Sequence, residues 1–276
     1  MTDLLIHSMS EFSSLILPCL DEAKVHTVNE IGSEFGGMSR VLAERCEAQG
    51  GTLTCIDPEP ADGFADWAQG LEHVHHRAQP SLEALTDCPA ADAWFVDGDH
   101  NYYTVFHELQ AIDAIQAEAG KPLLAFLHDV SWPCARRDFY YAPDRIPAGW
   151  RHPHSYDVGV RLDSGETFDH RGLRGMGHFA VALHAGGERN GVLTAVEDFL
   201  SYADSDARPL YYVHVPAVLG LGIIFDASAD WSAALAEFLL PYHANPLIAR
   251  LEENRLRNYL EVIDWQDRTA AQATAS

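Results

Sequence analysis

The chain has 276 residues, of which 41 are acidic and 18 basic, and its formal net charge is −23. Hydrophobic residues make up 47% of it, as in an ordinary globular protein, which excludes the disordered, collagen-like and coiled-coil classes. The negative charge disfavours nucleic acids and anionic membranes as partners, because both are polyanions that repel it at long range. A neutral or cationic small molecule is the better expectation for a ligand.

The apolar runs and the cysteines favour a cytoplasmic protein. No apolar run approaches the ~20 residues that span a bilayer, and no basic segment precedes one at the N-terminus. The five cysteines are scattered, odd in number and lack CxxC spacing, which argues against a disulfide framework and against a thiolate zinc site. We therefore expect free thiols.

The first half of the chain alternates short apolar or β-branched runs with helical stretches, the pattern of βαβ units in a parallel sheet. The expected strands are residues 25–31, 52–57, 73–78, 93–97 and 123–129. The expected helices are residues 39–48, 61–70, 81–85 and 102–119. In the last helix Val105, Leu109, Ile112 and Ile115 form one apolar stripe, and Gly120 ends it. Residues 1–130 are thus the expected α/β core.

Residues 131–189 interrupt this pattern. The segment is rich in Pro, Gly, Arg, His and aromatic residues, and it is too long for an ordinary connection. A disordered linker is the alternative, but linkers lack aromatic residues of the kind found here. We expect an ordered insertion that acts as a lid or substrate-recognition segment, or else as an interface.

Regular elements return in residues 190–268. A helix is expected over residues 190–202, and the strands expected at 210–215 and 219–226 are too close in sequence for a parallel crossover. The predicted fold is therefore α/β and Rossmann-like, with a seven-stranded mostly parallel sheet, a reversed final strand and helices on both faces. Two helices broken near Asn245-Pro246 are expected over residues 232–266, and a frayed tail over residues 269–276.

Acidic and histidine residues follow four of the predicted strands. The first strand ends in the segment from Glu30 to Ser39, and the second ends at Asp57. The fourth ends in Asp97-Gly98-Asp99-His100, and the fifth ends in His128-Asp129. The ligand site of an open parallel sheet lies outside the carboxyl ends of its strands, so these side chains are expected to converge. The alternative is structural, since Asp99 or Asn101 can simply cap the helix that follows.

The glycine loop after the first strand excludes two classes of nucleotide enzyme. Its spacing is not G-x-G-x-x-G, and Glu34 stands where a pyrophosphate would approach. The chain also lacks the P-loop pattern of phosphoryl-transfer proteins. The E-x-G-x-x-x-G pattern from Glu30 to Gly36, the acid Asp57 and the reversed strand together resemble the class I S-adenosylmethionine (SAM)-dependent methyltransferases.

That resemblance implies a SAM site. In the family, the loop holds the methionine portion of SAM and the acid after the second strand holds the ribose hydroxyls. The cofactor-binding residues it implies are Glu30, Gly32, Ser33, Gly36, Gly37, Ser39, Asp57 and Ala78.

The segments 95–100 and 126–129 further resemble the macrocin-type O-methyltransferases, which modify sugars on natural products. By position, this resemblance implies Asp97 and Asp129 as ligands of a divalent metal and His100 as the general base, with Asp97 also part of the catalytic set. His128 stands where relatives often carry an acid, and we include it among the metal ligands. A histidine there would move the preference from magnesium toward manganese, iron or zinc, or mean that no metal binds.

The insertion supplies candidates for binding the methyl acceptor. Its aromatic residues can stack on a sugar or ring, and its arginines can pair with a carboxylate or phosphate. These expected substrate residues are Trp132, Arg136, Arg137, Tyr140 and Tyr141. Internal ion pairs from the arginines to Asp138 and Asp144 are the structural alternative.

The sequence therefore predicts a SAM-dependent O-methyltransferase that acts on a hydroxyl of a small molecule, with a divalent metal and a histidine base. One alternative is a metal-independent methyltransferase acting on an amine or carboxylate. Another is a non-catalytic binding protein that keeps the cofactor pocket. A homo-oligomer formed through the C-terminal helices or the insertion is a further expectation.

Overall fold

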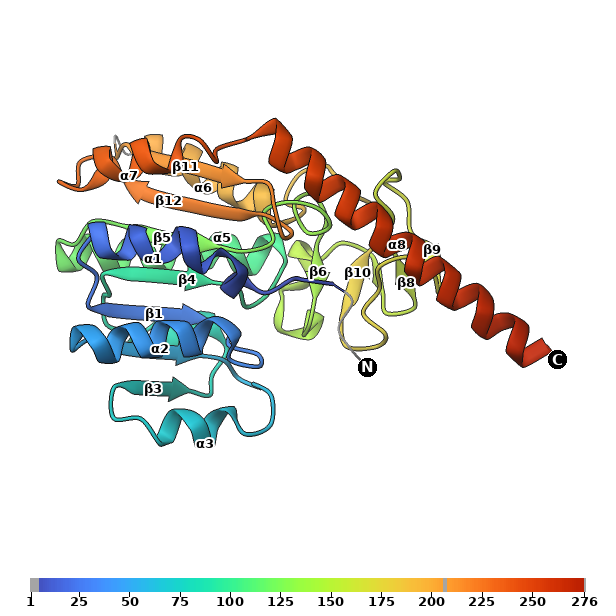
Figure 1. The fold of residues 1–276 in the computed structure, drawn as a ribbon, viewed down its shortest axis with the longest axis horizontal. Helices are drawn as coiled ribbons and strands as arrows, with labels where there is room; N and C mark the ends of the chain where they lie inside the picture. Colours follow the sequence, from blue (N-terminus) through green and yellow to red (C-terminus); the bar gives the residue numbers. More distant parts are fainter. Residues whose placement is uncertain (1–4, 206–207, 276) are drawn as a thin grey trace.

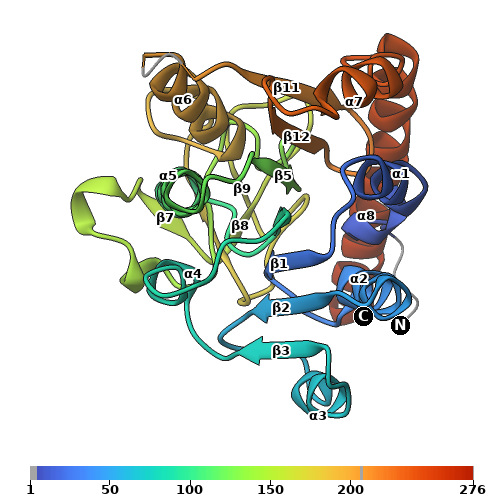
Figure 2. The same ribbon diagram turned by 90° about the vertical axis from the view of Figure 1, so that its left-hand side faces the viewer.

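The computed structural model describes residues 5–205 and 208–275, and its centre is a seven-stranded sheet (Figures 1 and 2). The strands are β1 (Thr27–Ile31), β2 (Thr52–Ile56), β3 (Val74–Arg77), β4 (Ala93–Val96), β5 (Leu124–Leu127), β11 (Leu210–Val215) and β12 (Leu221–Asp226). Their order across the sheet is β11-β12-β5-β4-β1-β2-β3. Strand β12 alone runs opposite to the other strands of this sheet, so its pairings with β11 and β5 are antiparallel. The predicted fold class, with its reversed final strand, is confirmed.

Helices cover both faces of the sheet, as Figure 2 shows. On one face lie η1 (Met9–Phe12), α1 (Ser13–Glu22), α2 (Gly37–Gln49), α3 (Phe64–Gln69) and α7 (Ser232–Leu239). On the other lie α4 (Ser81–Ala84), α5 (Tyr102–Ala119) and α6 (Val192–Ser205). Helix α1 was not predicted, because Pro18 interrupts its apolar pattern, yet Leu15, Ile16, Cys19 and Leu20 are all buried.

Helix α5 begins at the cap that the sequence offered as a structural alternative. Asn101 Oδ1 accepts a hydrogen bond from Thr104 N at 2.9 Å, and Gly120 ends the helix with a positive φ of 64°. The cap is therefore Asn101, and neither Asp99 nor His100 serves as the N-cap of α5. The expected stripe packs against the sheet, with Val105, Leu109 and Ile112 fully buried.

Helix α5 also buries a carboxyl group, that of Glu108. Within the described residues neither of its oxygens has a hydrogen-bond partner of good geometry, although Ser81 lies near enough to favour the charged form slightly. Burial raises the pKa of Glu108 to about 8. The group is therefore neutral in the folded protein at pH 7 and ionised in the unfolded chain.

We expect Glu108→Gln to stabilise the protein increasingly as pH rises. A carboxyl whose folded pKa lies above its unfolded value of 4.5 lowers the free energy of unfolding progressively between about pH 4.5 and 8. Near pH 8 the gain is expected to be on the order of a few kcal/mol, since each pKa unit corresponds to about 1.4 kcal/mol. Urea unfolding at pH 5.5 and 8 measures it. The same difference between variant and wild type at both pH values would contradict this origin.

The insertion, residues 131–189, is ordered and lies beyond the carboxyl ends of the parallel strands (Figure 1). It contains a three-stranded sheet of β6 (Phe139–Tyr140), β10 (Ala180–Ala182) and β7 (His154–Ser155). A two-stranded sheet of β8 (Val158–Gly159) and β9 (Phe168–Asp169) and the short helices η2 (Pro143–Arg145) and η3 (Ala148–Trp150) complete it. The disordered-linker alternative is therefore wrong.

A buried carboxylate ties the insertion to the core. Asp138 accepts hydrogen bonds from Tyr102 N and Gly191 N, both at 2.7 Å, and from the Tyr140 hydroxyl at 2.7 Å. These bonds join the first turn of α5, the entry to α6 and strand β6.

The C-terminal helices are broken where the sequence predicted. Asn245 Oδ1 accepts hydrogen bonds from Leu247 N and Ile248 N, and α8 (Pro246–Ala275) follows. Helix α8 continues to Ala275 through an alanine-rich stretch that favours it, and the fraying expected over residues 269–276 stays a prediction. No helix in the described part of the chain is both long enough and apolar enough to cross a membrane. The described cysteines are all free and buried.

Candidate active site

The β1–α2 loop lies in close contact with the end of β4. Gly32 has φ +84°, and a Cβ atom there would lie 2.1 Å from the carbonyl oxygen of Asp97. Only glycine fits this approach, which brings the loop beside the acidic strand ends. Gly36 also has a left-handed backbone, with φ +77°, and it is the N-cap residue directly before the first turn of α2. The loop therefore presents the N-terminus of α2 at the carboxyl edge of the sheet.

Glu30 supports this loop from beneath. It is 2% exposed, and its Oε2 accepts hydrogen bonds from Ser39 Oγ at 2.5 Å and Ser33 Oγ at 3.3 Å, with Cys55 Sγ also at 3.3 Å. Burial raises the pKa of Glu30 to about 7, although these hydrogen bonds favour its charged form. The structure thus gives Glu30 a positioning role for the loop.

Asp57, the acid after β2, also binds the loop. Its Oδ2 accepts hydrogen bonds from Ser33 N at 2.8 Å and Glu34 N at 3.0 Å, and its Oδ1 accepts one from Glu59 N at 2.9 Å. A carboxylate has about four acceptor positions, so Asp57 can bind ligand hydroxyls in addition to these groups. Ala78, which follows β3, is exposed.

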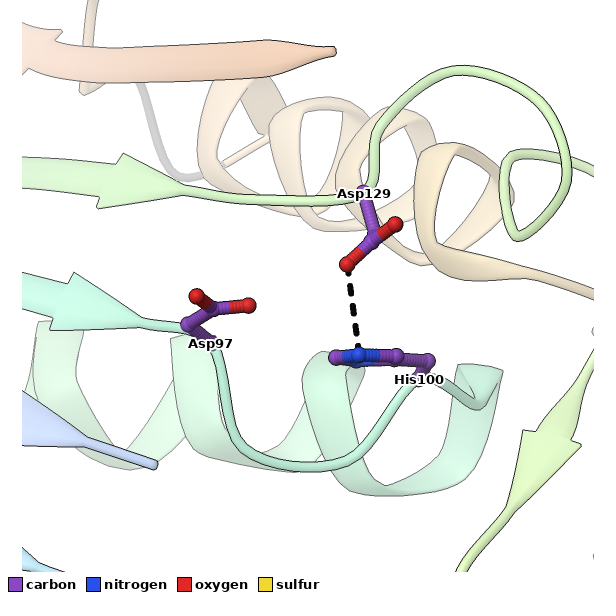
Figure 3. Close-up of side chains that lie close together, drawn as sticks. All are labelled: Asp97, His100 and Asp129. Carbon is purple, nitrogen blue, oxygen red and sulfur yellow. Dashed lines mark ion pairs between the residues drawn. The ribbon is translucent and has the colours of Figure 1, made fainter. Parts of the chain in front are cut away.

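Asp97, His100 and Asp129 come together at the ends of β4 and β5 (Figure 3). Each offers one ligand atom, and these atoms lie within 4.8 Å of one another. His100 Nε2 lies 3.2 Å from Asp129 Oδ2. Strand β6 fixes the backbone of His100, because Phe139 N donates a hydrogen bond to His100 O at 2.9 Å. The predicted convergence of strand-end residues is therefore present in the structure.

His128 lies between the two carboxylates. Its Nδ1 is 3.2 Å from Asp97 Oδ1 and 3.3 Å from Asp129 Oδ2, and its Nε2 lies 2.8 Å from Val218 O. Burial lowers the pKa of His128, but the charges of Asp97 and Asp129 outweigh it and raise that pKa well above its usual value. The raised pKa favours the imidazolium form of His128, in which both ring nitrogens donate.

The pKa of Asp129 is shifted in the opposite direction by its histidine neighbours. Asp129 is 5% exposed and has a left-handed φ of 59°. Burial raises the pKa of Asp129, but the neighbouring His100 and His128 outweigh burial and hold it at about 2. The site thus concentrates negative charge from two strands and partly balances it with a histidine cation.

Of the predicted substrate residues in the insertion, Tyr141 reaches this cluster. Its ring meets His100 edge to face, with centroids 5.6 Å apart, and meets Phe179 at 5.7 Å. Tyr141 is 49% exposed, so one side of the ring remains open. Trp132 is half-buried among apolar neighbours.

Two of the predicted substrate residues are buried in this structure, and their role stays a prediction. Arg137 is 3% exposed and donates to the backbone carbonyls of Ala182 and Gly165, so it links strands of the insertion. Tyr140 is fully buried, and its hydroxyl is held by Asp138. Both residues face inward because the insertion has its own small core, which the sequence pattern did not reveal.

Arg136 has a partner that the sequence did not indicate. It binds Glu197 of α6 through two hydrogen bonds of 2.6 Å. The predicted ion pairs from Arg136 and Arg137 to Asp138 and Asp144 are replaced by other contacts, and Asp144 pairs with Arg151 instead. The contacts of Val218 with His128 and of Phe179 with Tyr141 were also missed, because they are long-range contacts with no local sequence signal.

Comparison with known proteins gives one family match. Residues 29–129 match the model of a family described as a methyltransferase domain. Comparison with curated proteins gives no match.

Several solved structures resemble the chain at low identity. A putative O-methyltransferase from Klebsiella pneumoniae is 15% identical, with 79% of this chain and 80% of that chain covered and a TM-score of 0.44. A methyltransferase from Podospora anserina bound to SAH is 15% identical over 79% of each chain, with a TM-score of 0.46. An O-methyltransferase from Bacillus cereus in complex with SAH is 12% identical over 79% and 81%, with a TM-score of 0.46.

The family match covers the ends of β1, β2, β4 and β5, and therefore Asp57, Asp97, His100 and Asp129. The match agrees with the expected methyltransferase domain over residues 29–129, and the macrocin-type subtype stays a prediction.

Proposed function

We propose that the chain is a SAM-dependent O-methyltransferase that acts on a hydroxyl of a small molecule, such as a sugar or ring-bearing natural product of the macrocin type. The Asp97, His100 and Asp129 cluster carries this proposal, since it lies beside the glycine loop within the methyltransferase domain. An alcohol is a poor nucleophile until its proton is removed, so O-methylation needs a base in such a position. A cytoplasmic location remains part of the proposal.

The cluster fits a divalent cation by the chemistry of its donors. Two carboxylates from neighbouring strands and an imidazole supply oxygen and nitrogen ligands within one small space. Asp97 and Asp129 would hold the ion. The third ligand would be His100 of the same cluster, or the adjacent His128 once its Nδ1 proton is lost. The Nε2 contact of His128 with Val218 O is the kind of contact that orients metal-binding histidines. When bound, a divalent ion lowers the pKa of the acceptor hydroxyl.

The protein's own groups have distinct tasks in this reaction. Asp129 orients the His100 ring through the 3.2 Å contact of His100 Nε2 with Asp129 Oδ2, which leaves Nδ1 as the nitrogen that accepts the acceptor's proton. Tyr141 and Phe179 offer aromatic edges and faces against which a sugar or ring can pack. Asp57 and the loop it binds place SAM at the same edge of the sheet.

The position of His128 favours a second candidate, a metal-independent methyltransferase acting on an amine or carboxylate. Its imidazolium already lies within 3.3 Å of both carboxylates and supplies positive charge between them. In that case the lid alone orients the acceptor, and no ion is needed.

Methyl transfer from radiolabelled SAM to a panel of sugar, phenol, amine and carboxylate acceptors tests the proposal. Transfer to hydroxyl acceptors that is lost in chelator supports the first candidate. Transfer to amines or carboxylates that persists in chelator supports the second. SAM binding without transfer to any class would indicate the non-catalytic alternative.

We expect Asp57→Ala to weaken SAM binding by about 10- to 150-fold. Hydrogen bonds to a charged group contribute ~1.5–3 kcal/mol, and each 1.4 kcal/mol is tenfold in affinity. Titration calorimetry measures the change, with Glu59→Ala, an exposed acid on the same loop, as the matched control. Unchanged affinity in Asp57→Ala would refute the cofactor assignment, and a preference for NADH would refute the class.

A further inference from the structure

Helix α8 carries an exposed apolar stripe on the side away from the protein body. The residues of this outer stripe are Leu247, Leu251, Asn254, Asn258, Val262 and Trp265. Leu247, Leu251 and Trp265 are 66%, 62% and 63% exposed, values unusual for large apolar side chains gathered on one helix face. We propose that this stripe binds the same stripe of a second copy of the chain, with the two α8 helices antiparallel.

The opposite face of α8 is already used. Leu256 and Leu260 are buried, Glu252 accepts a hydrogen bond from Leu219 N at 3.0 Å, and Asp264 pairs with Arg161 at 3.2 Å. Figure 1 shows α8 running beside the insertion and extending past it at its C-terminal end. The inner contacts hold the helix in place, so the outer stripe is presented as a rigid surface.

The outer stripe has a symmetry that suits a two-fold axis. From either end it presents two apolar residues, then an asparagine, so that its two halves mirror each other about the midpoint between Asn254 and Asn258. An antiparallel pair placed on that midpoint sets Asn254 against the partner's Asn258. The same register sets Leu247 against the partner's Trp265. Such a surface is self-complementary, as a two-fold dimer interface requires.

Charge supports the same register. Arg250, which pairs with Glu253 of its own helix at 2.7 Å, lies with Glu261 on one flank of the outer stripe. The antiparallel register places Arg250 of each copy beside the partner's Glu261 as well. A parallel pair would not bring these two residues together. Asn258 Nδ2 donates a hydrogen bond to Asn254 Oδ1 at 3.1 Å within the helix, and the antiparallel register places this polar pair against the same pair of the partner.

The charge of α8 also permits two copies to approach. The chain as a whole carries −23, which makes two copies repel each other. Residues 246–275 contain four arginines and five acidic residues, so this helix is nearly neutral. The distance from Leu247 to Trp265 is about 27 Å along the helix at 1.5 Å per residue, long enough for a continuous helix–helix contact.

The first test measures mass in solution for the full chain. Light scattering during size-exclusion chromatography is expected to give twice the chain mass of 30.5 kDa for the wild type, and the single-chain mass for Leu251→Lys and for Trp265→Lys. Met176→Lys is the matched control, because Met176 is 72% exposed but lies on the insertion, and it should remain dimeric. Circular dichroism checks that each variant is folded.

The second test addresses the register. Arg250→Glu and Glu261→Arg are each expected to weaken the dimer about 3- to 10-fold, since each removes two symmetric ion pairs that are exposed and therefore individually weak. The double variant should restore wild-type affinity. A wild-type protein that stays at single-chain mass overturns the proposal, as does a Leu251→Lys variant that stays dimeric. A double variant weaker than both single variants overturns the antiparallel register.

Discussion

Replacing His100 with alanine is expected to lower kcat for methyl transfer by ~10²–10⁴-fold, the range typical of losing a general base. His100 Nε2 lies at the acidic cluster, 3.2 Å from Asp129 Oδ2, and Phe139 fixes its backbone. Its side chain does not support the glycine loop, which Asp57 and Glu30 hold. Affinity for SAM should therefore be unchanged. Steady-state kinetics and titration calorimetry measure the two quantities separately.

The control for this variant is His75→Ala, because His75 is an exposed histidine on the edge strand β3, away from the cluster. It should leave kcat unaltered. Measuring divalent-ion affinity of His100→Ala alongside kcat separates two roles for His100. If His100 is a ligand of the ion, the variant loses both ion affinity and turnover. If His100 is the base, the variant loses turnover alone. Wild-type kcat in His100→Ala would remove the residue from the mechanism.

The sheet and the placement of its strand-end residues could be predicted because both follow from local patterns. Parallel strands bring their carboxyl ends to one edge, so Asp57, Asp97 and Asp129 had to lie on the same side of the molecule. The cap at Asn101 and the end of α5 at Gly120 were predictable for a similar reason, since they depend on residues within one turn.

The parts that could not be predicted depend on contacts between distant segments. His128 was predicted as a metal ligand, but burial and the charges of Asp97 and Asp129 set its ionisation. Its Nε2 contacts the carbonyl oxygen of Val218, 90 residues away. Arg137 was predicted to face a substrate, yet it bonds carbonyls inside the insertion, whose strands of two or three residues have too short a pattern to recognise.

Removing divalent ions with a chelator is expected to abolish most of the turnover, and adding magnesium or manganese back should restore it. Asp97 and Asp129 provide the carboxylates, and an acceptor with adjacent hydroxyls can complete the ligand set. Cofactor binding should survive the treatment, because Asp57 and the glycine loop lie outside this donor set. Activity assays and SAM titration in the same chelated sample distinguish the two effects.

Asp97→Asn should weaken ion binding and turnover together, because an amide offers a neutral oxygen in place of a charged one. Asp144→Asn, at a fully exposed acid in the insertion, is the matched control.

Ion binding should also release a proton and tighten as pH rises, because the pKa of His128 is raised and its Nδ1 must lose a proton before it can act as a ligand. Calorimetry in two buffers with different ionisation enthalpies measures that proton. Full turnover in chelator, with no metal found by elemental analysis, would contradict the metal-assisted reaction and favour the metal-independent one. The positive charge between Asp97 and Asp129 would then come from the His128 imidazolium alone.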